Sequence, residues 1–185
     1  MFLPKGKGMS DEQLLEALSR EDATAQRQLY DRYAGKMFGV CMRYAKSTEE
    51  AEDFLQDGFI RVFRKLSSYK GEGSLEGWIR KVMVNTCLEH LRSQKISWEN
   101  IGPLEEPVED YQIPDHLEVK DLLQLIRSLP PGYGTIFNLF AIEGYGHKEI
   151  GEMLGISENT SKSQYSRARA QLLIMIRVHY KVKVG

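Results

Sequence analysis

The chain has 185 residues, of which 42% are hydrophobic and 28% are charged, and its formal net charge is −1. This composition suits a soluble globular protein with one ordinary core or two small ones. It argues against membrane insertion, because no window approaches the roughly 20 apolar residues that a spanning helix needs. Residues 1–9 have neither an apolar run nor a cleavage site, so we expect a disordered leader there, with Met9 as an alternative start of translation.

Four helices are predicted in the first half of the chain, from capping residues and from apolar residues at helical spacing. They span about residues 10–19, 22–44, 48–66 and 74–95. Asp22 is expected to cap the second helix, and Thr48 the third. The third helix carries an apolar stripe that we expect to face the core, made of Ala51, Phe54, Leu55, Gly58, Val62 and Leu66.

Three polar residues of the third helix lie together on another face. Asp53, Gln56 and Asp57 are at positions i, i+3 and i+4, which places them side by side on a helix. The residues alone indicate only a solvated face.

The two cysteines, Cys41 and Cys87, lie in apolar helical stretches without metal-ligand spacing. We expect buried, reduced thiols of a cytoplasmic protein rather than a disulfide or a metal site.

A strongly acidic segment follows the fourth helix. Between Ile96 and Val119 there is no Lys or Arg, whereas seven acids accumulate there among three prolines. The prolines and the missing apolar period prevent a helix, and the like charges repel each other into an extended chain. Residues 96–115 are therefore predicted to be a linker between two small all-α domains, at residues 10–95 and 116–185.

The second domain begins with two predicted helices. The first is marked by Leu117, Leu122, Leu125, Ile126 and Leu129 and ends at Pro130 and Pro131, and the second runs from about Tyr133 to Glu143.

The stretch GHKEIGEMLGISENTSKSQYSRARAQL, from Gly146 to Leu172, has the features of a helix-turn-helix. Gly151 is small where a second helix could cross closely, and Gly155 can adopt the left-handed turn conformation. Ile156 would fill the turn and Ser157 would cap the next helix. The segment therefore predicts two short helices at a steep angle.

The faces of this last helix differ in chemistry. Its core side is predicted to consist of Ser161, Tyr165, Ala168 and Leu172. Its outer side is rich in hydrogen-bond donors and consists of Asn159, Lys162, Ser163, Ser166 and Arg167. Such a helix fits the major groove of duplex DNA, with Arg169 and the later Arg177, Lys181 and Lys183 on phosphates. A solvated surface helix is the alternative.

From Ser10 to Ile176 the sequence resembles bacterial RNA polymerase sigma factors of the extracytoplasmic-function (ECF) group. The segments AEDFLQDGFIRVFRKLSSY and GWIRKVMVNTCLEHLR resemble region 2 of that family, and LPPGYGTIFNLFAIEGYGHKEIGEMLGISENTSKSQYSRARAQL resembles region 4. The resemblance implies two helical domains that bind core RNA polymerase and promoter DNA and start transcription, and it implies an anti-sigma factor as a common partner.

The resemblance also implies roles for single residues. Asp53, Gln56 and Asp57 match positions that bind the β′ clamp helices, and the β flap is a further polymerase contact of the family. For the −10 element, the loop from Leu66 to Ser74 matches the one that receives a flipped-out base, and it leads into a helix that meets the non-template strand. The residues implied for −10 binding are Tyr69, Lys70, Ser74, Trp78, Lys81, Asn85 and Glu89. Trp78 could stack on a base, but packing in the core is the favoured alternative.

Four outer residues of the last helix, Lys162, Ser163, Ser166 and Arg167, match the −35 readers of the family. The family usually has Val at Ser161, Arg at Gln164 and Leu at Tyr165, which bears on the promoter sequence rather than on DNA binding. We expect the Ser161 hydroxyl to bond a backbone carbonyl one turn back.

No pattern in the sequence supports catalysis. The four histidines are scattered without metal-ligand pairing, and there is no phosphate loop or nucleophile motif, so neither a metal nor a cofactor is expected. The rival functions are a free-standing regulator with the same helix-turn-helix and an adaptor that binds only protein.

Overall fold

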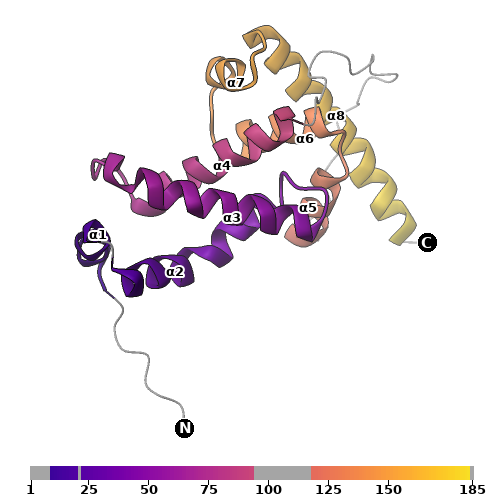
Figure 1. Cartoon of the computed structure of the whole chain (residues 1–185). Helices are drawn as coiled ribbons and strands as arrows, with labels where there is room; N and C mark the ends of the chain where they lie inside the picture. The colour runs from indigo at the N-terminus through magenta and orange to yellow at the C-terminus, as the bar shows by residue number, and fades with distance from the viewer. Residues whose placement is uncertain (1–8, 21, 94–117, 184–185) are drawn as a thin grey trace. The chain divides into compact units, whose positions relative to one another are not determined.

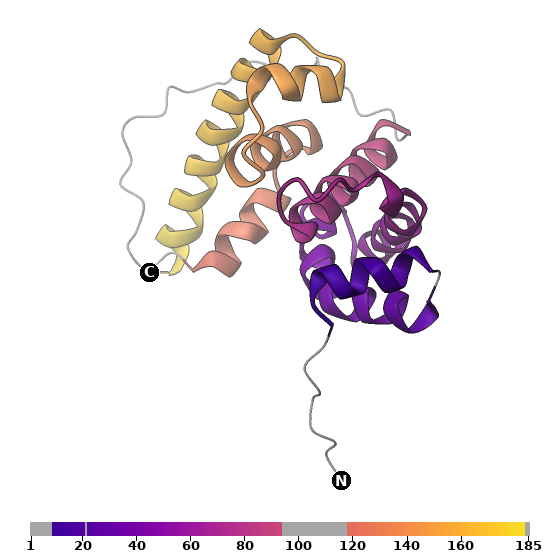
Figure 2. The same cartoon turned by 90° about the vertical axis from the view of Figure 1, so that its left-hand side faces the viewer.

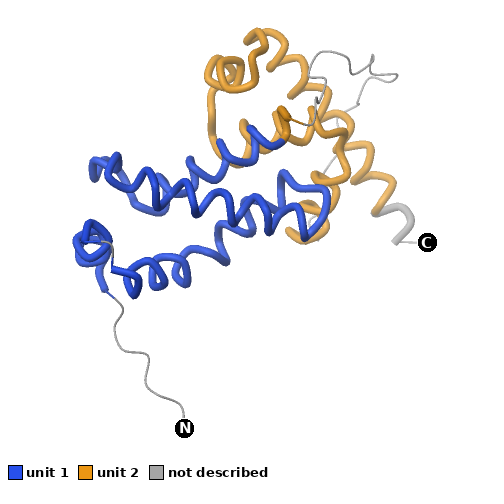
Figure 3. Tube along the Cα trace, in the orientation of Figure 1, with its two compact units in different colours: residues 1–90 blue, residues 91–185 orange. Residues whose placement is uncertain are grey.

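The computed structural model describes residues 9–20, 22–93 and 118–183, with side chains as far as His179. In these ranges the regular structure is helical throughout, which confirms the predicted all-α fold. The chain divides into two compact units, residues 1–90 and 91–185 (Figure 3). Residues 1–8 of the expected leader and the whole expected linker, residues 96–115, lie outside the described residues.

The first unit is built from four α-helices and a short 3₁₀ turn (Figure 1). They are α1 (Asp11–Ser19), α2 (Ala23–Cys41), α3 (Thr48–Lys65), η1 (Leu66–Ser68) and α4 (Leu75–Ser93). Asp22 caps α2, as predicted, and its side chain accepts from the backbone N–H of Thr24 at 2.7 Å. The expected cap of α3 is wrong by one residue. Ser47 has extended backbone angles and accepts from the N–H of Glu50 at 3.2 Å, whereas Thr48 is already helical.

Buried apolar residues of all four α-helices form the core of this unit. The predicted stripe of α3 is buried from Ala51 to Val62, whereas Leu66 is only partly buried and lies in η1. In α2, Leu29, Tyr33, Met37 and Val40 are buried. Helix α2 ends at Cys41, earlier than expected, because the N–H groups of Arg43 and Tyr44 bond carbonyls three residues back, at 3.1 Å and 2.9 Å.

A glycine allows α3 and α4 to approach each other closely. A Cβ added at Gly58 would overlap the sulfur of Met83 on α4. The two helices that carry the candidate residues of this unit are therefore in direct contact.

Both cysteines lie in this core and are free, which confirms the predicted buried thiols. Hydrogen bonding to Cys41 and burial raise the pKa of Cys87, so that this thiol stays protonated at neutral pH.

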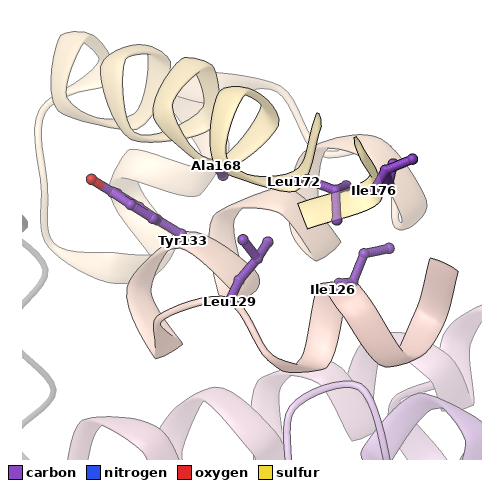
Figure 4. Close-up of a cluster of buried hydrophobic side chains, with 6 residues drawn as sticks. All are labelled: Ile126, Leu129, Tyr133, Ala168, Leu172 and Ile176. Carbon is purple, nitrogen blue, oxygen red and sulfur yellow. The ribbon is translucent and has the colours of Figure 1, made fainter. Parts of the chain in front are cut away.

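The second unit contains α5 (Val119–Arg127), α6 (Pro131–Phe137), η2 (Asn138–Ile142), α7 (His147–Leu154) and α8 (Glu158–Lys183). Figures 1 and 2 both show the long α8 beside α6 and α5. Its core consists of Ile126, Leu129, Tyr133, Ala168, Leu172 and Ile176. Figure 4 shows the side chains of α8 facing those of α5 and α6. One side of α8 is thus committed to the core.

The helix expected from Tyr133 to Glu143 begins earlier and is not regular throughout. Pro131 occupies its first turn, where a proline is favoured because its ring fixes φ and its missing N–H is not needed. After Phe137 the chain continues as a π-helical turn, in which the N–H of Glu143 bonds the carbonyl of Asn138 at 2.9 Å.

Candidate nucleic-acid and protein interfaces

The turn between α7 and α8 has the predicted glycine and cap, but the second helix, expected to be short, is α8 with 26 residues. Gly155 ends α7 in the left-handed conformation, with φ 70°, and the Ser157 hydroxyl accepts from the N–H of Thr160 at 2.9 Å. At Gly151 an added Cβ would lie 2.8 Å from the carbonyl oxygen of Ile156. The chain therefore needs glycine at this close approach, and the two helices form a helix-turn-helix.

The two faces of α8 are sorted almost as predicted. The exposed side chains on the outer face are Asn159, Lys162, Ser163, Ser166 and Arg169, and Arg167 is half-buried. Ser161, Ala168 and Leu172 are buried on the inner face, with Tyr165 partly buried beside them. Sequence reasoning missed that Gln164 is only 2% exposed. Its side chain therefore belongs to the inner side of the helix.

Two side chains of the outer face, Lys162 and Ser163, bond residues of α8 itself. The ammonium of Lys162 lies 2.6 Å from the Glu158 carboxylate, one turn earlier, and this bond lowers the pKa of Glu158. The Ser163 hydroxyl donates to the carbonyl of Thr160 at 3.0 Å. At Lys162 and Ser163, a ligand would meet side chains that are bonded to residues of their own helix.

On the inner face, Ser161 bonds a side chain of α7 instead of the expected carbonyl of its own helix. Nδ1 of His147 lies 3.0 Å from the Ser161 hydroxyl oxygen. The His147 ring stacks on Phe140, with centroids 4.2 Å apart and planes 9° apart, and Tyr165 packs against Phe140 at 4.5 Å. We call these four residues the His147 cluster. Burial, and next the charge of Lys162, lower the pKa of His147.

The candidate polymerase-binding face of α3 is exposed at Asp53 and Gln56, but Asp57 is engaged with α4. Its carboxylate lies 2.8 Å from Nε2 of His90. The His90 ring packs on Phe54, with centroids 4.7 Å apart. Asp57 therefore ties two helices together in addition to any partner contact.

An apolar groove that sequence reasoning missed adjoins this face. It has a volume of about 650 Å³. Its lining comes from α2 and α3 and consists of Tyr30, Phe38, Glu52, Leu55, Gln56, Phe59, Ile60 and Phe63. We call it the α2–α3 groove. Tyr30 and Ile60 are each 42% exposed, which is unusual for large apolar side chains. Gln56 belongs both to the polar face and to the groove, so that the two form a continuous surface.

The loop between α3 and α4 is closed by its own residues. The Tyr69 hydroxyl donates to the carbonyl of Gly73 at 2.8 Å, and Gly71 and Gly73 have φ of 76° and 79°. Ser74 accepts from the N–H of Gly77 at 3.1 Å. Trp78 is only partly buried and faces the Tyr69 ring at 5.7 Å. Trp78 thus packs at the edge of the core, neither fully buried nor exposed, while Lys70 is exposed on the same loop.

Three candidate −10 residues of α4 share one exposed face. Lys81, Asn85 and Glu89 follow at intervals of four residues and are all exposed. Glu89 forms an ion pair with Arg61 of α3. Asn85 thus lies between the exposed Lys81 and Glu89, whose carboxylate is already paired with Arg61.

Within the described ranges no group of three or more His, Cys, Asp or Glu side chains could hold a metal ion. In the same part of the chain, every helix is too short or too polar to cross a bilayer.

Family comparisons match both units. Residues 29–96 match the family model of sigma-70 region 2, and residues 120–172 match that of sigma-70 region 4. A solved structure of the sigma factor RpoE in complex with the anti-sigma factor NepR, from Bartonella quintana, is similar to the chain with a TM-score of 0.53. It covers 82% of this chain and 96% of RpoE at 18% identity, and supports the fold.

Curated relatives extend the match over nearly the whole chain. The ECF RNA polymerase sigma-E factor of Haemophilus influenzae is 28% identical over 178 residues, which are 89% of this chain and 94% of that protein. The ECF RNA polymerase sigma factor SigM of Mycobacterium tuberculosis is 30% identical over 165 residues, covering 88% of this chain and 83% of the relative. With regions 2 and 4 in the order of the family and folded as separate helical units, the chain belongs to the ECF group of RNA polymerase sigma factors.

Proposed function

We propose that this chain gives core RNA polymerase its promoter specificity through three surfaces of its own. The outer face of α8 reads the −35 element, the loop before α4 and the exposed face of α4 bind the opened −10 element, and α3 binds the enzyme. The observation that carries the proposal is the outer face of α8, which presents amide, hydroxyl and cationic donors on a helix whose other side is fixed in the core.

At the −35 element, Lys162 and Arg167 supply the cations that bond guanine edges or phosphates. Asn159, Ser163 and Ser166 reach neighbouring bases and backbone, and Arg169 binds a phosphate. DNA displaces Glu158 from Lys162, because a phosphate offers the ammonium a stronger electrostatic partner than one exposed carboxylate.

At the −10 element, strand opening costs a few kcal/mol for each base that leaves the stack, and contacts with the freed bases offset this cost. The loop of Tyr69, Lys70 and Ser74 receives a flipped base. Trp78 is available as a stacking platform because it is only partly buried. Lys81, Asn85 and Glu89 follow the non-template strand along α4.

On the enzyme side, Asp53, Gln56 and Asp57 bind the β′ clamp helices, and the second unit binds the β flap. The α2–α3 groove extends the first of these contacts, since Gln56 lines it. An apolar side chain of the clamp helices in this groove would add contact area to a face that is otherwise polar.

Promoter DNA and core RNA polymerase are therefore the partners, and the protein acts by binding rather than by catalysis, in the cytoplasm. The complex of RpoE with NepR supports an anti-sigma factor as a further partner of this chain. Such a factor would regulate the protein by covering the surfaces that meet the polymerase.

The test is a gel-shift titration of promoter DNA at matched salt, with and without core polymerase. The protein alone should bind weakly and with steep salt dependence, because phosphate contacts dominate. Core polymerase should strengthen binding by holding both DNA-reading units in register, and defined transcripts should follow. Tight, specific binding by the isolated protein that polymerase does not improve would favour a free-standing regulator.

Asn85→Ala separates strand opening from initial binding. We expect reduced permanganate reactivity near the start site with little change in the closed complex. Lys46→Ala, at an exposed lysine between α2 and α3, is the control for a substitution elsewhere in the same unit.

A further inference from the structure

The His147 cluster packs on the inner face of α8, opposite the face proposed to bind DNA. Ser161 is 0% exposed, and a buried hydroxyl requires a hydrogen-bond partner. A serine in a helix can bond the carbonyl one turn back, but here the partner is His147, at 3.0 Å and on the other helix of the motif. The bond therefore connects α7 to α8 rather than α8 to itself.

Aromatic contacts fix the imidazole in place. His147 stacks on Phe140 of η2 at 4.2 Å and faces Tyr165 of α8 at 5.8 Å. Tyr165 in turn stacks on Phe137 at 5.8 Å and an interplanar angle of 23°. Because these rings come from α6, η2, α7 and α8, a rotation of α8 would disturb several contacts at once.

The inner anchors are direct sequence neighbours of the outer readers. Ser161 precedes Lys162, and Tyr165 precedes Ser166. Since a helix is rigid over one turn, the orientation of an inner side chain sets that of its outer neighbour. A side-chain tip about 8 Å from the helix axis moves by about 1.4 Å when the helix turns by about 10°. That displacement is enough to break a hydrogen bond to a base edge.

We propose that His147 is a positioning residue for −35 recognition, which through Ser161 and Tyr165 fixes the rotation of α8 and so the direction of its DNA-facing side chains. The inference rests on the proposed function. According to this inference, His147 contributes measurably to promoter discrimination although it does not face the major groove of DNA.

The groups around the ring favour a neutral imidazole. From α8 it is faced by Lys162 and Glu158, whose charges act in opposite directions, and by the neutral Tyr165. Phe140 of η2 is uncharged, and on α7 itself Lys148 follows His147 directly in the sequence and acts on Glu158. With a pKa below its usual value, His147 is neutral at pH 7, and its Nδ1 can accept a hydrogen bond from Ser161.

The test is a double-mutant cycle with His147→Phe, Ser161→Val and the two combined, in the full chain bound to core polymerase. His147→Phe keeps a ring for stacking and loses the bond, whereas Ser161→Val replaces the hydroxyl by a methyl group and adds a second methyl group. Each complex is titrated with a promoter that carries both elements and with fork-junction DNA that carries only the −10 element.

Each single variant should lose about fivefold or more in affinity for the complete promoter, because the bond that fixes the rotation of α8 is lost. Affinity for the −10 DNA should change less than about twofold, and the double variant should lose less than the product of the two single losses. Equal affinities on the complete promoter, equal losses on both DNAs, or losses that simply multiply would overturn the inference.

A second measurement needs neither DNA nor polymerase. In the free full chain, Ser161→Val should move the Nδ1 resonance of the His147 imidazole, while Ser128→Ala, at the end of α5, should leave it in place. An unmoved resonance would refute the bond on which the inference stands. Failure of the unaltered protein to bind the promoter would instead refute the proposed function.

Discussion

The two units hold their candidate interface residues in different ways. In the first unit two of these residues bridge helices, because Asp57 bonds His90 and Glu89 pairs with Arg61, each across α3 and α4. In the second unit, Lys162 on the outer face of α8 pairs with Glu158 of the same helix.

This difference determines what a partner must displace. Asp57 and His90 are partly exposed, with 47% and 31% of their side chains accessible, so their pair contributes at most about 1 kcal/mol. A partner of the first unit competes with such ties between helices. DNA at α8 displaces a contact inside one helix and leaves the packing beneath it unchanged. Substitutions at Asp57 or Glu89 therefore change folding and binding together, whereas Lys162→Ala isolates binding.

The largest expected effect compares two glycines, one in each unit. Gly151→Ala should lower the free energy of unfolding of the second unit by about 1–3 kcal/mol, because its Cβ would press on the backbone carbonyl of Ile156. Gly58→Ala should cost less, because its Cβ meets the end of the Met83 side chain, which can change rotamer. Denaturant unfolding with a probe in each unit measures both.

Gly35→Ala in α2 is the matched control, since nothing lies within 4 Å of its added Cβ. It should stabilise the first unit by up to about 1 kcal/mol, through helix propensity alone. A larger loss at Gly58 than at Gly151 would contradict the view that backbone contact, rather than side-chain contact, limits these positions.

The second prediction tests whether substitutions on α8 weaken DNA binding without lowering stability. Lys162→Ala and Arg167→Ala should each weaken binding to the −35 element by about 1–3 kcal/mol if they bond bases. Thermal unfolding should be nearly unchanged for Lys162→Ala, which loses only an exposed pair. Lys120→Ala, at an exposed lysine of α5, should leave promoter affinity as it was. Unchanged affinity of the Lys162 and Arg167 double variant would refute the assignment of α8 as the reader of the −35 element.

The third prediction separates binding from folding on α3. Asp53→Lys and Asp57→Lys should both reduce association with core polymerase in a pull-down. Only Asp57→Lys should also lower the free energy of unfolding, by up to about 1 kcal/mol, because it breaks the contact with His90. His90→Gln should reproduce the stability loss. If both aspartate variants bound core polymerase normally, α3 would present only a solvated face.

The smallest effect concerns pH in the second unit. The pKa of folded His147 is lowered by burial and by Lys162, so the folded state favours the neutral ring. This contribution to stability is fully present above the unfolded pKa of about 6.5 and is lost as pH falls through the lower folded value. His147→Phe should remove that part of the pH dependence, measured by thermal unfolding from pH 7.5 to about pH 5. His179→Phe should retain it. Superimposable profiles for His147→Phe and the unaltered chain would show that the ring is not the titrating group.

The faces of the helices were predictable because helical periodicity is a local property. The inner positions of α2 and α8 follow from spacing alone, and Gly155 and Ser157 mark the turn by their conformational and capping preferences. The exact start of α3 was less certain, because Ser47 and Thr48 are adjacent and both can cap a helix.

Contacts between helices were not predictable in the same way. The pattern indicated that Ser161 is buried, but its partner lies 14 residues away on α7 and is defined only by the packing. The α2–α3 groove likewise requires two helices to be placed side by side. The burial of Gln164 likewise depends on how α8 packs against the other helices of its unit.

The assignment of partners came from the resemblance rather than from physical pattern. Nothing in the spacing of Asp53, Gln56 and Asp57 distinguishes a polymerase contact from a solvated face. By contrast, the donor-rich face of α8 indicated DNA from its chemistry and its turn alone.

The two cysteines can serve as reporters of the opening of the first unit. The sequence contains no others, and Cys41 and Cys87 are both 0% exposed in the core of the first unit. A thiol reagent can modify them only when α2 and α4 separate, so the rate of labelling measures how often that core opens. Movements of the helix-turn-helix leave this signal unchanged. Labelling with and without core polymerase would therefore measure how often the first unit opens, and the second unit of the same chain would not contribute to the signal.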